Sequence, residues 1–494
     1  MFESAELGHK IDKATYDAEV PKLREDLLNA QFDLAQNAGF PVIILAGGVD
    51  GAGKGKTVNL LNAWMDPRHI QVHAMGEQSD EERERPPMWR FWRALPPKGK
   101  IGVFFGSWYT SPIVDRVMGR TSASDLNQSI DEINHFETML TNEGALIIKF
   151  WFHLAKDVQR KRLKGLEKDP RTRWRVTDLD WQRFKLYGKF RKVSEHTLRA
   201  TTTAEAPWII IEGADARYRN LTTGKILLEA LRKRLNRPVH TVTTAAAPLQ
   251  APIDSLNVFD TLDMAQKLAR KQFDAELEKY QGKLNLLTRD ERFRNMSVIA
   301  LFEGFDAAGK GGAIRRITGA LDARYCRIIP VAAPTEEERA QPYLWRFWRH
   351  IPRTGRVTIF DRSWYGRVLV ERVEKFCSEA DWMRAYSEIN DFEEQLVKHN
   401  TVLVKFWLTI TREEQLRRFK EREKTGFKRF KITGEDWRNR KKWDEYEAAV
   451  CDMVDRTSTG IAPWTLVEAN DKNYARIKIL RTLCRQIEAA MKRK

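Results

Sequence analysis

The sequence has little cysteine and no long apolar segment. Its four cysteines form no C-x-x-C pair, so neither a zinc site nor a disulfide framework is expected. This pattern suits a reducing compartment, and we predict a cytoplasmic protein. No apolar stretch approaches the roughly 18 residues of a membrane-spanning helix, and no secretory signal is visible, so we expect no membrane partner.

Acidic residues are also fewer than basic residues. The chain of 494 residues has 68 Asp and Glu against 85 Lys and Arg, which leaves a formal net charge of +17. Hydrophobic residues make up 42% of the chain, too many for a disordered polyelectrolyte. A folded protein with a positive field favours an anionic partner. Composition alone leaves nucleic acid, acidic lipid and phosphorylated metabolites open.

The chain repeats itself at a constant offset. Residues 47–55 read GGVDGAGKG and residues 303–311 read EGFDAAGKG, so that Lys54 and Lys310 are 256 residues apart. The same offset relates the WRFWR segment at Trp89 to that at Trp345, and the Pro-Trp pair at Pro207 to that at Pro463. A constant offset indicates a tandem duplication. We predict an N-terminal domain over residues 1–237, a linker over 238–256 and a C-terminal domain over 257–494.

Short apolar segments alternate with helical patterns in each half. We predict strands at 42–46 in the first half and at 298–302, 357–360, 401–408 and 463–467 in the second. A charge-patterned helix is expected over 264–283. Strands that alternate with helices predict an α/β fold, with a parallel sheet flanked by helices in each half.

A glycine-rich turn follows the first predicted strand of each half. Residues 304–310 read GFDAAGK, which fits the G-x-x-x-x-G-K core of a P-loop. Backbone N–H groups of such a loop surround a phosphate, the following helix adds its dipole, and Lys310 supplies a mobile positive charge. The sequence therefore predicts two tandem P-loop kinase-like domains. The predicted phosphate-binding residues of the loop are Gly304, Ala308, Gly309, Gly311 and Gly312.

The usual Ser or Thr after the P-loop lysine is absent, because Gly311 stands there. The hydroxyl that commonly binds Mg²⁺ is therefore missing. Asp306 inside the loop and Asp361 at the end of strand 357–360 are the candidate ligands for Mg²⁺, with Mn²⁺ as the alternative ion. A cap of the helix that starts near Ser363 is the competing interpretation of Asp361.

Arginines follow the second carboxylate and gather again in a later segment. Arginine can stabilise the charge on a transferring phosphoryl group, so Arg362 joins Asp306, Lys310 and Asp361 as a predicted catalytic residue. Residues 412–442 contain 13 Lys or Arg and 6 Asp or Glu, which favours a basic helical lid over a merely solvated helix face. The further predicted phosphate-binding residues are Arg316, Arg367, Arg372, Arg418, Lys428 and Arg429.

The two halves differ at the positions that carry chemistry. The pair Asp361-Arg362 corresponds to Phe105-Gly106 in the first half. The first half keeps a degenerate loop with Asp50, Gly53, Lys54 and Gly55. We predict that the C-terminal half performs the chemistry and that the N-terminal half serves packing or binding.

These motifs together resemble the family-2 polyphosphate kinases. The segments that carry the resemblance are GFDAAGKGG at 304–312, PYLWRFW at 342–348, FDRSWYGRVLVERV at 360–373 and APWTLVEANDK at 462–472. Within that family, the tandem form resembles the polyphosphate:AMP phosphotransferases. The resemblance implies transfer of the terminal phosphoryl group of inorganic polyphosphate to AMP, giving ADP, with Mg²⁺ and a basic polyphosphate channel. It also implies that the C-terminal domain is the active one.

Other functions remain open at the level of sequence. A polyphosphate-dependent kinase could act on nucleoside diphosphates or on other nucleoside monophosphates. An ATP-dependent nucleoside monophosphate kinase would share the P-loop but would be expected to keep the Ser or Thr. A binding protein could stack nucleic-acid bases on Trp345, Phe347 and Trp348. Because these aromatics recur in both halves, we interpret them as packing residues and expect no nucleic-acid partner. The oligomeric state stays open, with a homo-oligomer as one option.

Overall fold

The computed structural model describes residues 1–236, 257–426, 430 and 432–492. The predicted linker 238–256, and Lys428 and Arg429 of the predicted lid, lie outside the described residues. The chain forms two compact units. The first takes most of the N-terminal half together with Thr335–Trp345, and the second takes most of the C-terminal half together with Gln78–Trp89.

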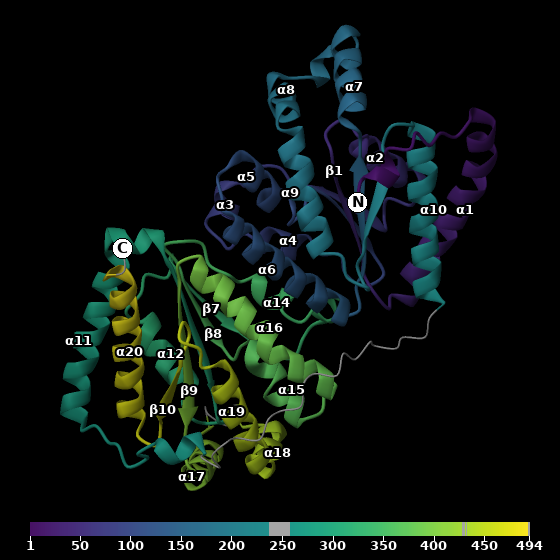
Figure 1. Cartoon of the computed structure of the whole chain (residues 1–494). Coiled ribbons are helices and arrows are strands. Elements are labelled where there is room, and N and C mark those ends of the chain that lie inside the picture. The colour runs from purple at the N-terminus through teal and green to yellow at the C-terminus, as the bar shows by residue number, and fades with distance from the viewer. Residues whose placement is uncertain (237–256, 427–429, 431, 493–494) are drawn as a thin grey trace. The chain divides into compact units, whose positions relative to one another are not determined.

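The first unit contains a five-stranded parallel sheet with the strand order β2-β3-β1-β4-β5. Helices α1, α2 and α10 cover one face and α5, α6 and α9 the other, while α7 and α8 project from the body (Figure 1). The strands are β1 (Val42–Gly48), β2 (Ile70–Ala74), β3 (Ile101–Phe105), β4 (Leu146–His153) and β5 (Trp208–Glu212). The helices of the N-terminal half are α1 (Lys13–Asn37), α2 (Lys54–Trp64), α3 (Asp80–Arg83), α4 (Trp89–Ala94), α5 (Thr110–Met118), α6 (Ala123–Asn142), α7 (Lys156–Lys168), α8 (Asp178–Lys185), α9 (Tyr187–Ala200) and α10 (Ala216–Leu235).

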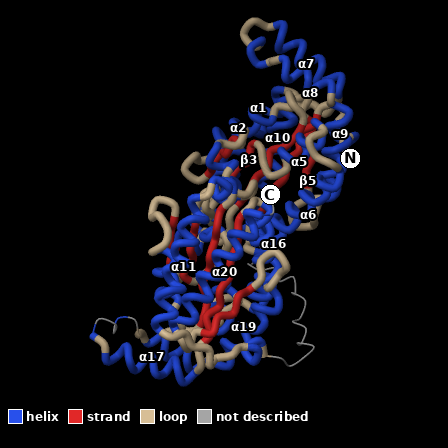
Figure 2. Tube along the Cα trace, turned by 90° about the vertical axis from the view of Figure 1, so that its left-hand side faces the viewer, coloured by secondary structure: helices blue, strands red, loops and turns tan. Residues whose placement is uncertain are grey.

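The second unit repeats this architecture, with the strand order β7-β8-β6-β9-β10. The red strands of Figure 2 lie between blue helices, as a three-layer α/β domain requires. The strands are β6 (Ser297–Gly304), β7 (Cys326–Pro330), β8 (Val357–Asp361), β9 (Thr401–Thr409) and β10 (Trp464–Glu468). The helices of the C-terminal half are α11 (Arg270–Arg289), α12 (Lys310–Thr318), α13 (Glu336–Arg339), α14 (Trp345–Trp348), α15 (Val370–Val373), α16 (Glu379–Lys398), α17 (Arg412–Lys424), α18 (Gly434–Lys441), α19 (Trp443–Thr457) and α20 (Lys472–Lys492).

The predicted fold class is confirmed, while each predicted element differs from the observed one at one end or at both. The central strands are apolar runs buried on both faces, which is why the sequence locates them well. The helix predicted over 264–283 begins only at Arg270, because the side chain of Asp263 accepts hydrogen bonds from Ala265 N and Gln266 Nε2 and holds a turn there. Strand β10 begins at Trp464, since Pro463 has no N–H for the ladder.

Each core contains a buried ion pair in addition to its apolar side chains. Lys405 Nζ lies 2.7 Å from Glu393 Oε2 and also donates to Tyr365 Oη and Thr457 O. Lys149 and Glu137 form the equivalent pair in the first unit, also at 2.7 Å. The aromatic side chains of Trp345, Phe347 and Trp348 are buried, in agreement with a packing role. No helix in the described part of the chain is long and apolar enough to cross a membrane.

Candidate active site

The P-loop of the second unit joins β6 to α12. Gly304 has φ +148°, and a Cβ there would lie 2.5 Å from Leu408 O, so only glycine fits. Gly309 caps α12 with φ +114°. Lys310 Nζ donates to Gly304 O at 2.6 Å, which folds the side chain back over the loop. The sequence thus forms an anion cradle at the N-terminus of α12.

Asp306 is held between the loop and α18. Its Oδ2 accepts a hydrogen bond from Asn439 Nδ2 at 2.8 Å, and its Oδ1 lies 3.7 Å from a guanidinium nitrogen of Arg362. The main-chain oxygen of Asp306 accepts from Gln415 Nε2 of α17 at 3.1 Å. Two segments of the predicted lid therefore contact the loop directly, and one of those contacts reaches the carboxylate.

Asp361 and Arg362 occupy the end of β8, next to β6. Phe302 pairs with Asp361 across the two strands, which brings the end of β8 beside the P-loop. Arg362 has φ +66°, a left-handed conformation that a side chain with a Cβ rarely adopts. Its N–H donates to Phe302 O at 3.0 Å. Such strain persists only where the surrounding structure holds it, and it is concentrated at functional sites.

Glu303 is a buried carboxyl beside this turn that the sequence analysis did not single out. Its Oε1 accepts a hydrogen bond from Ser363 Oγ at 2.7 Å. Burial raises the pKa of Glu303, while Ser363, Lys310 and Arg362 act in the opposite direction. The sequence does hold a signal for this position, because the first half has Gly47 at the equivalent place.

One pocket of about 490 Å³ brings most of the predicted site residues together. Asp306, Lys310, Asp361 and Arg362 all line it, as do Ala308, Gly309, Gly311, Gly312 and Arg316 of the predicted phosphate-binding set. Its charged lining consists of six cations and three carboxylates: Lys310, Arg315, Arg316, Arg362, Arg422, Arg476, Asp306, Asp361 and Asp436. The excess of cations suits a highly charged anionic ligand.

Three predicted phosphate-binding arginines have protein partners of their own. Arg367 pairs with Glu371 at 2.9 Å, and Arg372 pairs with Asp452 at 2.7 Å; neither lines the pocket. Arg418 is buried, and its guanidinium donates to Glu414 and to the carbonyl oxygens of Ala307, Ala308, Ala469 and Asn470. These contacts use all five N–H donors of the arginine, so Arg418 fastens the loop to its neighbours.

The loop of the first unit keeps the backbone but not the surrounding chemistry. Lys54 Nζ donates to Gly48 O at 2.5 Å, as Lys310 does to Gly304 O. Asp50 lies 3.6 Å from Lys54 and 3.7 Å from Arg183. Burial lowers the pKa of Lys54. Because Phe105 and Gly106 replace the aspartate and arginine, this loop lacks the second carboxylate.

The profile described as Polyphosphate kinase 2 matches residues 10–238 and 267–494. The chain belongs to the polyphosphate kinase 2 family. The chain is 59% identical to a polyphosphate:AMP phosphotransferase of Pseudomonas aeruginosa over the full length of both chains. It is 55% identical to a protein of the same name from Pseudomonas syringae pv. tomato, over all of this chain and 99% of that one. A crystal structure of a polyphosphate kinase 2 from Pseudomonas aeruginosa covers both chains fully with a TM-score of 0.90 and 56% identity.

A divalent cation fits the donor set of this polyphosphate kinase 2 site. Within the described residues, no three His, Cys, Asp or Glu side chains come together as a metal cluster. Mg²⁺ is commonly bound by one or two carboxylates together with substrate phosphates and water. Asp306 and Asp361 provide two carboxylates in the pocket, and phosphate oxygens would complete the coordination.

Proposed function

We propose that this protein transfers the terminal phosphoryl group of inorganic polyphosphate to AMP, giving ADP, with the chemistry in the C-terminal domain. The observation that carries the proposal is the single pocket in which Asp306, Lys310, Asp361 and Arg362 meet the P-loop. The names of the full-length relatives point to the same substrates. Its four cysteines are free thiols, so we keep the cytoplasm as the proposed compartment.

In the proposed reaction, an oxygen of the AMP phosphate attacks the terminal phosphorus of polyphosphate. The bond from that phosphorus to the bridging oxygen breaks, and the oxygen stays on the shortened polyphosphate. The acceptor phosphate is largely ionised near neutral pH, so no strong base is required. Catalysis then consists of positioning and charge stabilisation, as is usual for phosphoryl transfer.

The P-loop, the two carboxylates and three arginines of the pocket have distinct roles in that scheme. The loop N–H groups and Lys310 bind phosphate oxygens, and Arg362, Arg315 and Arg316 neutralise charge as the phosphoryl group moves. Asp306 and Asp361 would hold Mg²⁺, which when bound screens the charges of neighbouring phosphates and lets two anions approach. Asn439 fixes the orientation of Asp306 through its hydrogen bond.

The direct test is incubation of the full chain with long-chain polyphosphate, Mg²⁺ and AMP, with chromatographic detection of ADP. We expect ADP, and none when polyphosphate is omitted. GDP from GMP, or ATP from ADP, without any ADP from AMP would replace the proposed acceptor but keep polyphosphate as the donor. ADP formed from AMP and ATP in the absence of polyphosphate would indicate an ATP-dependent nucleoside monophosphate kinase instead.

A further inference from the structure

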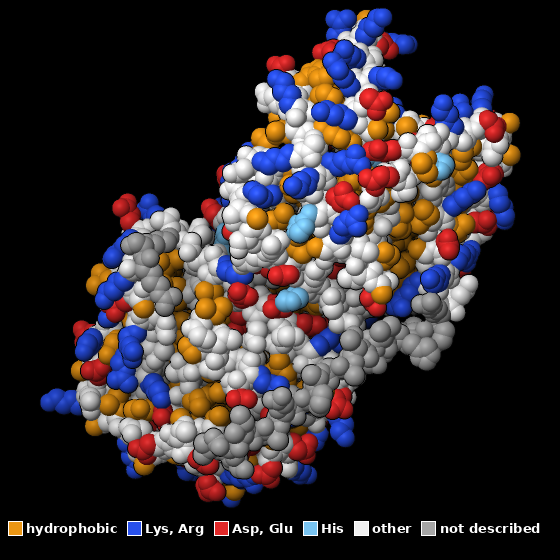
Figure 3. All heavy atoms as spheres, in the orientation of Figure 1, with side chains coloured by type: hydrophobic (Ala, Val, Ile, Leu, Met, Phe, Trp, Pro, Cys, Tyr) orange, Lys and Arg blue, Asp and Glu red, His pale blue; other side chains and the backbone are white. Residues whose placement is uncertain are grey.

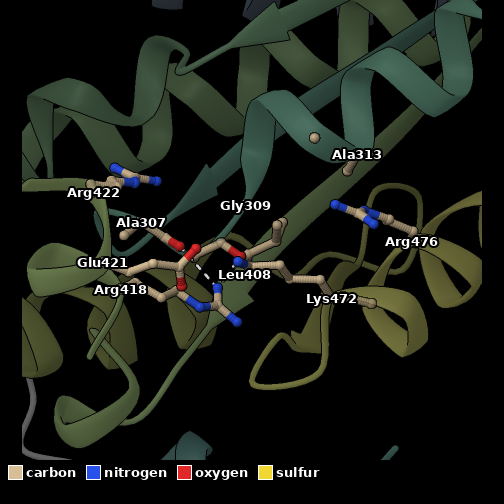
Figure 4. A pocket seen from close by; sticks show the side chains of 12 residues that line it. Ala307, Gly309, Ala313, Leu408, Arg418, Glu421, Arg422, Lys472 and Arg476 are labelled. Carbon is tan, nitrogen blue, oxygen red and sulfur yellow. Dashed lines mark hydrogen bonds between the residues drawn. The ribbon is translucent and has the colours of Figure 1, made fainter. Parts of the chain in front are cut away.

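The first unit lacks the cations that stand beside the P-loop in the second unit. In the second unit, Arg422, Lys472 and Arg476 line a smaller cavity of about 210 Å³ next to the loop (Figure 4). The residues 256 positions earlier are Leu166, Ala216 and Asn220. None of these carries a charge, so the first unit offers no comparable cationic lining at its own loop.

Arg219 occupies the space over the first P-loop. A Cβ built on Gly53 would lie 2.4 Å from the guanidinium carbon of Arg219, whereas a Cβ built on Gly309 would meet nothing within 4 Å. The Nε of Arg219 donates to Thr57 Oγ1 at 2.8 Å, and its guanidinium donates to Gly213 O at 3.1 Å. The first unit therefore lacks both the open space and the loop-facing cations of the second.

The positive charge of the first unit is found instead on α7, the counterpart of α17. Each helix contains six Lys or Arg, but α7 has two acidic residues where α17 has four. In α17, Arg417 pairs with Glu414 at 2.7 Å and with Glu421 at 3.4 Å. Val158 and Gly165 stand at the positions of these two glutamates in α7. The net charge of α7 is therefore +4, against +2 for α17.

Three cations of α7 form a stripe along the helix: Arg160, Lys164 and Lys168. They are spaced by four residues, so they share one face over about 12 Å. All three are exposed, and within the described residues none of them has a hydrogen-bond or ion-pair partner. Gln159 and Leu163 are buried on another side of α7, which fixes the direction of the stripe. Like charges at this spacing destabilise a helix, so the stripe does not serve the helix itself.

Carboxylates near the stripe are engaged with other groups. Asp157 lies 3.9 Å from Lys161 Nζ, beside the stripe. Glu167 accepts a hydrogen bond from Trp181 Nε1 at 3.4 Å. Figure 3 shows Lys and Arg side chains crowding α7 and α8, which project at the top of the view. The stripe is therefore a positive surface that the surrounding residues leave unneutralised, and an anion bound there would reduce the repulsion between its members.

The residues around the stripe favour a linear polyanion without bases. Proteins that bind single-stranded nucleic acid place aromatic side chains along a basic groove, and α7 contains no aromatic residue. Trp174 is exposed in the turn η2 (Arg173–Arg175) that follows α7. Its indole N–H donates to Arg171 O at 3.0 Å, and the Arg175 guanidinium carbon lies 4.9 Å from its ring centroid. A row of cations without a stacking platform fits a chain of phosphates.

We propose that Arg160, Lys164 and Lys168 form a docking surface for inorganic polyphosphate on the first unit, in addition to the active site of the second. The choice of polyphosphate among polyanions rests on the proposed function. Exposed cations hold such a chain in a salt-dependent manner and without fixing its register. The first unit thereby keeps long chains on the protein and raises their effective concentration for the reaction.

The first experiment measures binding of end-labelled long-chain polyphosphate to the full-length protein by fluorescence anisotropy, without AMP. The stripe variant carries Arg160→Gln, Lys164→Gln and Lys168→Gln. The control variant loses one arginine and two lysines that are equally exposed, through Lys10→Gln, Lys13→Gln and Arg24→Gln.

We expect the Kd of the stripe variant to rise about tenfold and its plot of log affinity against log salt to flatten by about 2, because three phosphate contacts are lost. The control should change less than twofold. Equal changes in the two variants, or none in the stripe variant, would overturn the proposal. Thermal melting should show no loss of stability, since repulsion between like charges is removed. If the stripe variant melts lower, Lys164→Gln alone is compared with Lys13→Gln.

Steady-state kinetics tests the consequence for turnover. The stripe variant should raise the KM for long-chain polyphosphate about fivefold and leave the KM for AMP unchanged, because the effective concentration of long chains falls. With tripolyphosphate as donor, kcat and KM should stay within twofold of the unaltered protein. An equal loss with tripolyphosphate would mean that the stripe acts on the active site or on the fold, and not as a docking surface.

A competition experiment tests the class of polyanion. Single-stranded RNA with the same number of phosphates should displace labelled polyphosphate at least tenfold less well than unlabelled polyphosphate does, and Trp174→Ala should leave the Kd for polyphosphate within twofold. RNA that binds more tightly than polyphosphate, and that loses its affinity in Trp174→Ala, would identify the stripe as a nucleic-acid surface and overturn the proposal.

These measurements separate failure of the docking surface from failure of the proposed function. If the unaltered chain makes no ADP from polyphosphate and AMP, but the stripe variant alone loses polyphosphate binding, the surface is real and the function is wrong. If ADP forms and the stripe variant behaves as the control does, the function stands and this inference falls alone.

Discussion

The two units share one strand order and one set of backbone turns, but they place different side chains on those turns. Among the described residues of the second unit, four other than glycine have positive φ: Ala307, Arg362, Lys375 and Asn400. Each stands at the position of a glycine with positive φ in the first unit: Gly51, Gly106, Gly119 and Gly144. The first unit therefore adopts these turns without strain, whereas the second bears a conformational cost at each.

Two of the four strained positions border the proposed active site. Ala307 lies in the P-loop and Arg362 at the end of β8, and both line the larger pocket. Strain at a functional site is retained when the residue type is needed there. The two units share one fold and differ in whether a residue other than glycine is needed at these turns. Substitutions at equivalent positions of the two units test that difference.

The largest expected effect is on the carboxylates. Asp361→Asn or Asp306→Asn should lower kcat for ADP formation about 10³-fold, roughly 4 kcal/mol, because the metal-binding charge is lost. Asp50→Asn in the first unit should change kcat less than twofold. Steady-state kinetics on the three full-length variants tests this, and an equal loss for Asp50→Asn and Asp306→Asn would end the functional asymmetry.

The buried ion pairs should instead behave alike in both units. Lys405→Met leaves Glu393 buried without its cation, and Lys149→Met does the same to Glu137. We expect each to lower the free energy of unfolding of its own unit by about 3 kcal/mol. Chemical denaturation measures this. The double variant Lys405→Met with Glu393→Gln should recover part of the loss, and no loss from either single variant would show that the pair is dispensable.

Arg362→Gly should separate catalysis from stability. Removing the guanidinium should reduce kcat about 10²-fold, roughly 2.7 kcal/mol, because charge on the moving phosphoryl group loses a partner. Relief of the positive φ should keep the free energy of unfolding unchanged or raise it by up to about 1 kcal/mol. Activity assays and thermal melting of one preparation test both. A joint fall of activity and stability would mean that Arg362 serves the fold.

Part of the fold and part of the candidate site could be predicted from the sequence. The buried strands are continuous apolar runs, and the loop glycines at 304 and 309 stand at fixed spacing, so both are visible without a structure. The role of Arg418 could not be predicted. The sequence shows that a cation is present, but not that Glu414 and four carbonyl oxygens accept all of its hydrogen bonds. Arg219 is a second case, since nothing local reveals that its guanidinium lies against Gly53. Long-range packing decides both cases.

Glu303 should give the second unit a pH dependence that the first lacks at the equivalent Gly47. Its pKa in the folded protein is raised above the ordinary value of 4.5 by burial. The folded state therefore binds its proton more tightly than the unfolded state, and this contribution to stability is full below pH 4.5 and is lost as pH rises through the raised pKa.

Replacement by Gln removes that contribution. The free energy of unfolding of the native protein minus that of Glu303→Gln should fall as pH rises from 4.5 through the raised pKa. Denaturation curves at a series of pH values measure the difference. A difference that rises with pH would mean that the ionised carboxylate is the form the fold prefers.

The smallest effect concerns a strained position away from the pocket. Lys375 follows α15 with φ +59°, and Gly119 caps α5 with φ +77° at the equivalent place. Lys375→Gly should raise the free energy of unfolding by about 0.5 kcal/mol, because the gain from relieved strain exceeds the added freedom of the unfolded chain. Gly119→Ala should lower it by about 1 kcal/mol, and only through the backbone, since a Cβ there meets nothing closer than 4.0 Å. Neither should alter kcat. If both substitutions destabilise their units, the strained residues of the second unit are there for packing, and the link between strain and catalysis would have to rest on Ala307 and Arg362 alone.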